Sequence, residues 1–262
     1  MLNGILTNAE IWYPLSDGQI EVLENVDLML LRKLLKGHSK APKETFFMET
    51  GLLPIKFMVI KRRLLYLHNI LTKPKSELIS KVYEVQRQMF TKHDWYNLVM
   101  ENRSQLEIVQ SDEQISKMSR DRFSNIVSKA VEKKAAEYLN SIATKHSKSK
   151  PLIKPSLAKE KYFEDPTFTK SEVEHLFALR TRMVTGIKKN FSMQFNNNIA
   201  CEFCHVQVDC QEHLLKCVEL SKHVKIPADV EYGDLFKDTV KQLRIVKIFK
   251  SLLRARETLK TI

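Results

Sequence analysis

The run PIKFMVIKRRLLYLHNIL occupies residues 54–71 and shows the pattern that dominates the chain. Its apolar side chains recur at intervals of three and four residues, as on one face of an α-helix. These side chains are Phe57, Ile60, Leu64, Leu67 and Ile70. The spacing therefore predicts a long amphipathic helix that begins at Pro54 and ends near Leu71.

The other face of this helix is basic. Four cations occur within eight residues, with no acidic residue between them: Lys56, Lys61, Arg62 and Arg63. Such a run is often just a solvated helix face. It can also neutralise phosphates, which gives affinity for nucleic acid without sequence preference. We predict that these four residues contact phosphates.

The same periodicity continues to both sides of this segment. We expect further helices at about 16–36, 42–50, 76–90, 93–107, 112–117, 119–144, 170–185, 211–217 and 234–258. No strand longer than four residues and no internal repeat is evident. Only 6 of the 262 residues are glycine, which argues against sandwiches, barrels and glycine-rich phosphate loops. The predicted fold class is all-α.

One break in composition divides the chain. Residues 145–165 are basic and rich in serine and proline, which is typical of a linker. We therefore expect four consecutive regions: 1–74, 75–144, the linker 145–165, and 166–262 with its closing helix 234–258.

Charge and cysteine placement limit the function and the compartment. The 43 Lys and Arg residues exceed the 31 Asp and Glu residues, which gives a net charge of +12 and favours an anionic partner such as nucleic acid. No uninterrupted apolar run reaches the ~18 residues of a membrane span. The opening MLNGILTNAE lacks the basic start of a secretory signal. We expect a nuclear or cytoplasmic protein that is not secreted.

All four cysteines fall in one short segment, residues 201–217. A disulfide framework would be spread along the chain, so clustering indicates a metal site in a reducing compartment. The pattern C-x2-C-x8-H-x3-C assigns the ligands Cys201, Cys204, His213 and Cys217. Three thiolates and one imidazole form a closed structural zinc site. We expect His213 and Cys217 to share one helix face, because they are four residues apart.

Two further donors lie within this segment, and either could replace one of the four ligands. They are Cys210, the stronger candidate, and His205. A redox-active CxxC is a third interpretation, but that motif usually accompanies a βαβ unit, which this sequence does not contain.

The segment from Cys201 to Cys217, which ends in QEHLLKC, resembles the carboxy-terminal zinc motif of reverse transcriptases from non-LTR (LINE-type) retrotransposons. Other stretches resemble the segment before that motif and the region just past the polymerase palm. They are FALRTRM at 177–183, KKNF at 188–191, NAEIWY at 8–13, LLRKLL at 30–35, PKE at 42–44 and ETGLLPI at 49–55. The resemblance covers most of the chain, most specifically residues 8–72 and 177–217.

This resemblance implies a helical thumb-like bundle, then a second helical region that carries a small CCHC zinc subdomain. In the family, the corresponding region grips the RNA template and the target DNA. The family's catalytic Tyr-x-Asp-Asp motif is missing, since the chain has no Asp-Asp pair. The resemblance therefore implies a nucleic-acid-binding fragment that is not itself an enzyme. Its partners would be RNA, DNA or both, and the missing polymerase core.

A second basic set precedes the zinc motif and is expected to contact phosphates as well: Arg180, Arg182, Lys188 and Lys189. Two alternatives remain open. The helices could form a zinc-stapled scaffold for protein interaction, with exposed apolar stripes on 54–71 or 235–258. The chain could also be an inert product of a decayed element, which predicts poor folding.

Overall fold

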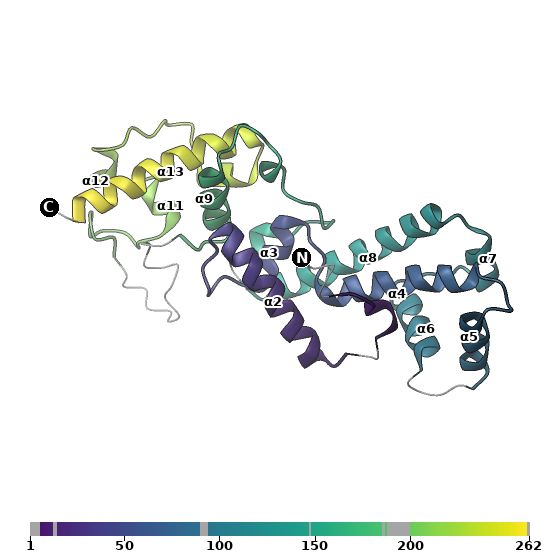
Figure 1. Cartoon of the computed structure of the whole chain (residues 1–262). Coiled ribbons are helices and arrows are strands. Elements are labelled where there is room, and N and C mark those ends of the chain that lie inside the picture. Colours follow the sequence, from purple (N-terminus) through teal and green to yellow (C-terminus); the bar gives the residue numbers. More distant parts are fainter. Residues whose placement is uncertain are drawn as a thin grey trace. The chain divides into compact units, whose positions relative to one another are not determined.

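The computed structural model describes residues 6–12, 15–89, 94–146, 148–184, 187 and 200–260. Within these ranges the chain is helical, and the one extended pairing is a single antiparallel bridge between Ala200 and Val208. The all-α prediction is confirmed for this part of the chain (Figure 1). Among the described helices, none combines the length and apolarity needed to cross a bilayer.

The elements lie close to the predicted boundaries over most of the chain. In order they are η1 (Ala9–Ile11), α2 (Asp17–Leu35), α3 (Lys43–Thr50), α4 (Ile55–Leu71), α5 (Leu78–Met89), α6 (Trp95–Gln105), α7 (Asp112–Lys117), α8 (Arg120–Ala143), η2 (Lys150–Leu152), η3 (Lys161–Phe163), α9 (Lys170–Arg180), α11 (Gln211–Leu214), α12 (Val218–Ser221), η4 (Tyr232–Phe236) and α13 (Thr239–Lys260).

The chain forms two compact units, and neither of them is continuous in sequence. Unit 1 comprises residues 1–28, 52–141 and 154–157. Unit 2 comprises residues 29–51, 142–153 and 158–262.

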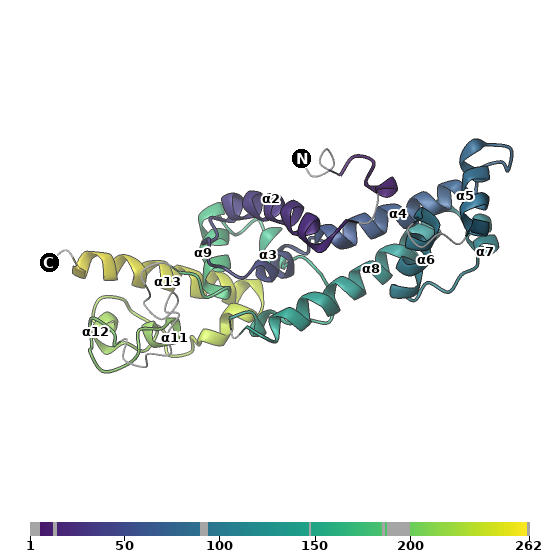
Figure 2. The same ribbon diagram turned by 90° about the horizontal axis from the view of Figure 1, so that it is seen from below.

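Unit 1 is built around α4, which contacts η1, α5, α6 and α7. The ring of Phe57 lies 5.7 Å from that of Tyr138, and His68 stacks on Phe123 at 5.5 Å. These two pairs join opposite ends of α4 and α8, so the two helices pack antiparallel, as can be followed in Figure 2. The apolar face predicted from the sequence of residues 54–71 is buried here: Phe57, Ile60, Leu64, Leu67 and Ile70.

Unit 2 has its core between α9 and α13, which pack against each other and against η4. Cys201 and Cys217 are fully buried members of the same core. The apolar residues that join them include Leu176, Leu179, Leu214, Leu220, Ile245, Val246, Phe249 and Leu252. The cysteine segment is therefore packed into the unit and is not a separate appendage.

Two helices of unit 2 are followed by a residue with a left-handed backbone conformation. Gly51 closes α3 in the left-handed region at φ 68°, and a β-carbon there would lie 2.4 Å from the Lys159 nitrogen. Helix α9 ends at Arg180, although we predicted an end near residue 185. The Thr181 hydroxyl donates to the Phe177 carbonyl, and Arg182 is left-handed at φ 55°, which stops the helix.

The segment 145–165, expected to be a linker, contains well-packed residues. Leu152 and Leu157 are buried, and Tyr162 is completely buried. The Tyr162 hydroxyl donates a hydrogen bond to Glu49 at 2.7 Å. The segment has the composition of a linker, but it buries Leu152, Leu157 and Tyr162.

Candidate metal centre and basic sites

Four potential ligand atoms meet at one point in unit 2. The sulfurs of Cys201, Cys204 and Cys217 and a nitrogen of His213 all lie within 4.8 Å of one another. The Sγ atoms of Cys201 and Cys217 are 3.9 Å apart, and Cys204 Sγ is 3.3 Å from His213 Nε2. A tetrahedral zinc ion, with bonds of about 2.0–2.3 Å, separates its ligand atoms by roughly 3.5–3.8 Å. The spacing thus fits one small tetrahedral ion.

A tight hairpin presents the first two cysteines. The Ala200–Val208 bridge opens it, and Cys201 N–H donates to the Gln207 carbonyl at 2.7 Å. The turn closes where His205 N–H donates to the Cys201 carbonyl at 2.9 Å, with His205 left-handed at φ 55°. The two cysteines of a C-x2-C pair thereby face the same side of the turn.

Backbone N–H groups surround the thiols. Burial opposes ionisation of Cys204, but donation from the N–H groups of Val206 and Gln207 lowers its pKa overall. Burial dominates at Cys217 and raises its pKa to about 11, although the N–H of Leu220 donates to its sulfur. Such N–H donors stabilise thiolates, the form of cysteine that binds metal.

The imidazole of His213 is oriented by a second hydrogen bond. Its Nδ1 lies 2.8 Å from Oε1 of Gln207, so the Nδ1 proton is donated to that amide oxygen. This leaves the lone pair of Nε2 directed at the cysteine group. Burial lowers the pKa of His213, which favours the neutral, metal-binding form.

The last two ligands do not share a helix, and this corrects our expectation. His213 lies on α11, which ends at Leu214, whereas Cys217 is the residue before α12 and has an extended backbone. A turn at Leu215 and Lys216 separates them. The two side chains still converge, since their ligand atoms lie within 4.8 Å of each other.

The four-atom group contains neither of the two substitute donors. His205 is exposed at the tip of the hairpin, and Cys210 precedes α11 without joining the cluster. In the described part of the chain, the geometry thus favours the ligand set predicted from the spacing.

A buried arginine of α13, Arg256, contacts the hairpin that carries Cys201 and Cys204. Arg256 donates to both carboxylate oxygens of Asp209, at 2.7 and 3.1 Å, and to Glu202 at 3.1 Å. Its guanidinium also lies 5.0 Å from the centre of the Phe203 ring. The spacing of cysteines and histidine gave no sign of Arg256, which is 39 residues beyond Cys217 in the sequence.

The first basic set does not form one exposed face. Arg63 is buried and donates to Asn102 at 2.9 Å and to the Trp12 carbonyl at 3.3 Å. Lys56, Lys61 and Arg62 are half-buried, and Arg62 also donates to the Leu6 carbonyl. The predicted phosphate contact is wrong for Arg63, because its guanidinium serves the interior of unit 1.

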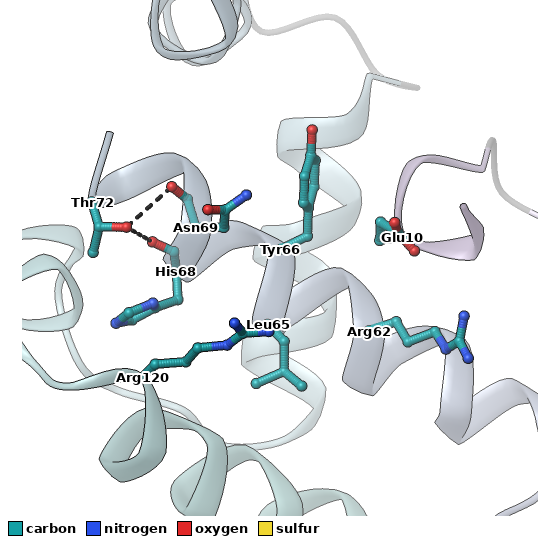
Figure 3. Close-up of a pocket in the computed structure, with 8 residues that line it drawn as sticks. All are labelled: Glu10, Arg62, Leu65, Tyr66, His68, Asn69, Thr72 and Arg120. Atoms are coloured by element: carbon teal, nitrogen blue, oxygen red, sulfur yellow. Dashed lines mark hydrogen bonds between the residues drawn. The ribbon is translucent and has the colours of Figure 1, made fainter. Parts of the chain in front are cut away.

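Arg62 also lines a hollow of unit 1 with a volume of about 630 Å³. Figure 3 shows Arg62 from α4 and Arg120 from α8 among its lining side chains, with Glu10, Tyr66 and His68. The Nε2 of His68 donates to the Met118 carbonyl at 3.0 Å. The hollow is therefore of mixed charge, with two arginines and one carboxylate.

The second basic set is also divided. Arg180 is buried in an ionic network with Glu49 and Glu160, so the predicted phosphate contact is wrong for this residue too. Arg182 is half-buried, forms an ion pair with Glu212 and lies 5.4 Å from the Tyr232 ring. Lys188 and Lys189 lie outside the described residues.

Comparisons with known proteins identify no relative. No protein-family model, no curated protein and no solved structure matches the chain.

Proposed function

We propose that Cys201, Cys204, His213 and Cys217 hold one structural zinc ion. The observation that carries the proposal is the convergence of their four ligand atoms within 4.8 Å, with nitrogen–sulfur and sulfur–sulfur spacings near those of a tetrahedron. Three sulfurs and one nitrogen leave no open position for a catalytic water, so the role is structural.

We further propose that the chain is a nucleic-acid-binding carboxy-terminal fragment of a non-LTR retrotransposon reverse transcriptase. The support is the motif order in the sequence, the net charge of +12 and the intact ligand group. The fragment has no polymerase motif and therefore no polymerase activity of its own. RNA template, target DNA and the polymerase core would be its partners, in the nucleus or cytoplasm.

A salt titration tests the binding. Fluorescence anisotropy of a labelled single-stranded RNA should show affinity that falls steeply between 50 and 200 mM salt. If Lys56, Lys61, Arg62, Arg182, Lys188 and Lys189 each neutralise one phosphate, the log–log slope is about −4. A slope near zero, or no binding at low salt, would contradict the proposal.

One observation supports the alternative of a protein-interaction scaffold. The stripes expected on 54–71 and 235–258 are largely buried, but α5 exposes four apolar side chains at helical spacing. They are Leu78, Val82, Val85 and Met89, which are 42–77% exposed. If this stripe binds protein, light scattering should show self-association or capture of the polymerase core, and Val82→Lys with Val85→Lys should abolish it. A monodisperse monomer that binds RNA would exclude this alternative.

A further inference from the structure

A second hollow, of about 530 Å³, lies in unit 2 and has no residue of the ligand group in its lining. One wall is the chain entering α3, and the other is the turn that follows residue 142. The charged and polar lining residues are Lys40, Lys43, Glu44, Lys145, His146 and Lys148. Neither basic set that we recognised in the sequence includes any of these residues.

Backbone hydrogen bonds form turns in the described part of this wall, residues 142–146 and 148–150. Lys145 N–H donates to the Ile142 carbonyl at 3.0 Å, and His146 N–H donates to the Ala143 carbonyl at 3.1 Å. Ser149 N–H then donates to the His146 carbonyl at 3.0 Å. Lys145 is therefore held in a hydrogen-bonded turn, although the composition of this segment is that of a linker.

A buried hydrogen bond ties the two walls together. Ser149 is fully buried, and its hydroxyl donates to Oε1 of Glu44 in the first turn of α3 at 2.7 Å. Glu44 itself is 2% exposed. The single carboxylate of the lining is thus turned toward the protein, while Lys40 and Lys145 are exposed.

The charge of this hollow is strongly positive. The lining contains four ammonium groups and one buried carboxylate, which gives an excess of three positive charges before His146 is counted. Burial and the nearby cations Arg182 and Lys40 lower the pKa of Lys148. The start of α3 adds the positive end of a helix dipole, and Pro42 supplies no capping side chain there.

We propose that this hollow, lined by Lys40, Lys43, Lys145 and Lys148, binds phosphates of a nucleic-acid backbone. The proposal rests on the nucleic-acid binding proposed above and gives it a location in unit 2. Ammonium groups hold phosphates as point charges, and the described lining contains no Phe, Tyr or Trp ring to stack on a base, its one aromatic ring being the imidazole of His146. Binding here is therefore independent of sequence.

The decisive experiment compares two double variants of the full chain. Lys145→Gln with Lys148→Gln removes two lysines of the hollow. Lys225→Gln with Lys241→Gln removes two exposed lysines elsewhere in unit 2 and is the charge-matched control. Each is titrated with labelled oligouridine by anisotropy across the same salt series, with inorganic phosphate as a competitor in a separate arm.

We expect the hollow variant to bind roughly tenfold more weakly near 0.15 M salt, with a log–log slope shallower by about 1.4, since each single-strand contact contributes about 0.7. The control should retain the wild-type slope. Lys145→Arg with Lys148→Arg should restore binding, because it restores both charges. Inorganic phosphate that displaces the RNA at millimolar levels would identify the shared anion; no displacement would assign the site to the polymeric backbone.

Lysine acetylation of the wild-type protein gives a readout that does not depend on how a variant folds. With oligouridine bound, Lys145 and Lys148 should be protected, whereas Lys225 and Lys241 should react as before. Equal effects of the two double variants, or equal acetylation, would overturn this site while leaving nucleic-acid binding intact. Absence of any RNA binding by the wild-type chain would overturn the proposed function and this site with it.

Discussion

Arg180 and Arg256 are two buried arginines of unit 2 with nearly the same surroundings. Each meets two carboxylates and has at least one aromatic ring beside its guanidinium. Arg180 bonds Glu49 at 2.9 and 3.0 Å, across 131 residues of sequence. Arg256 bonds Asp209 and Glu202, both within or next to the hairpin that carries the first two cysteines.

The difference lies in what holds the carboxylates in place. Glu49 belongs to α3, and Tyr162 donates to it from a second packed segment, so helix packing positions the partners of Arg180. The partners of Arg256 lie in a loop with one bridge and a four-residue helix. A buried ion pair is favourable only when its geometry is already in place. Helix packing holds the carboxylate partners of Arg180 in place. We infer that a bound metal ion holds the loop that carries the partners of Arg256.

Metal removal should have the largest effect, and it should affect the Arg256 network and not the Arg180 network. Cys201→Ser should lose bound zinc and unfold residues 200–217, because structural zinc supplies about 10–16 kcal/mol of apparent folding free energy in small zinc peptides. Hydrogen exchange should show lost protection in that segment and around Arg256, with little change around Glu49 and Arg180. Zinc content is measured by atomic absorption.

The matched control for that variant is Cys210→Ser, which removes a cysteine outside the ligand group. It should keep one equivalent of zinc and wild-type exchange. If Cys201→Ser keeps its zinc, or Cys210→Ser loses it, the ligand assignment is wrong.

Breaking the packed network should be the next largest effect. Arg180→Met leaves Glu49 buried without its guanidinium partner, and we expect about 3–5 kcal/mol lower stability. Urea denaturation measures the loss, and zinc content should not change. Adding Glu49→Gln should recover part of it, because the unpaired charge is removed. A loss below about 1 kcal/mol would show that Arg180 is dispensable for folding.

The loss of stability caused by substituting Arg256 should depend on whether zinc is bound. Arg256→Met should cost about 2–3 kcal/mol in the zinc-loaded protein, since one of its partners, Glu202, is 24% exposed and remains partly solvated. After chelation the same substitution should change stability by less than about 0.5 kcal/mol. Paired urea titrations with and without chelator measure this. An equal cost in both states would remove the distinction between the two networks.

An exposed ion pair of the same unit should give the smallest effect. Donation from Arg244 holds the pKa of Asp229 below its usual range. A lowered carboxyl pKa stabilises the fold above the unfolded-state pKa of about 3.9 and stops doing so as pH falls through the folded value. Asp229→Asn should therefore lower the Tm slightly at pH 7, and the difference should vanish in strong acid. A difference that is constant with pH would have another cause.

Much of the fold could be predicted because its signals are local. The helix limits at 112–117 and at Gly51 follow from periodicity and from a left-handed glycine, which act within one or two turns. The ligand set also follows from local spacing, since Cys201 and Cys204 must lie on one tight turn. The helix predicted through Cys217 failed for the opposite reason: nothing nearby in sequence shows that α11 ends at Leu214.

The sequence by itself determined the helical class of this protein, its excess of positive charge and the four residues that can hold a metal. Only the tertiary structure decided which cations are buried. Arg63 and Arg180 carry the same charge as Lys145 and Lys148, but folding buries the first two against Asn102 and Glu49. Folding places the other two, Lys145 and Lys148, in the lining of a hollow. Burial depends on neighbours that are distant in sequence, and the pattern of basic residues does not indicate which neighbours these are.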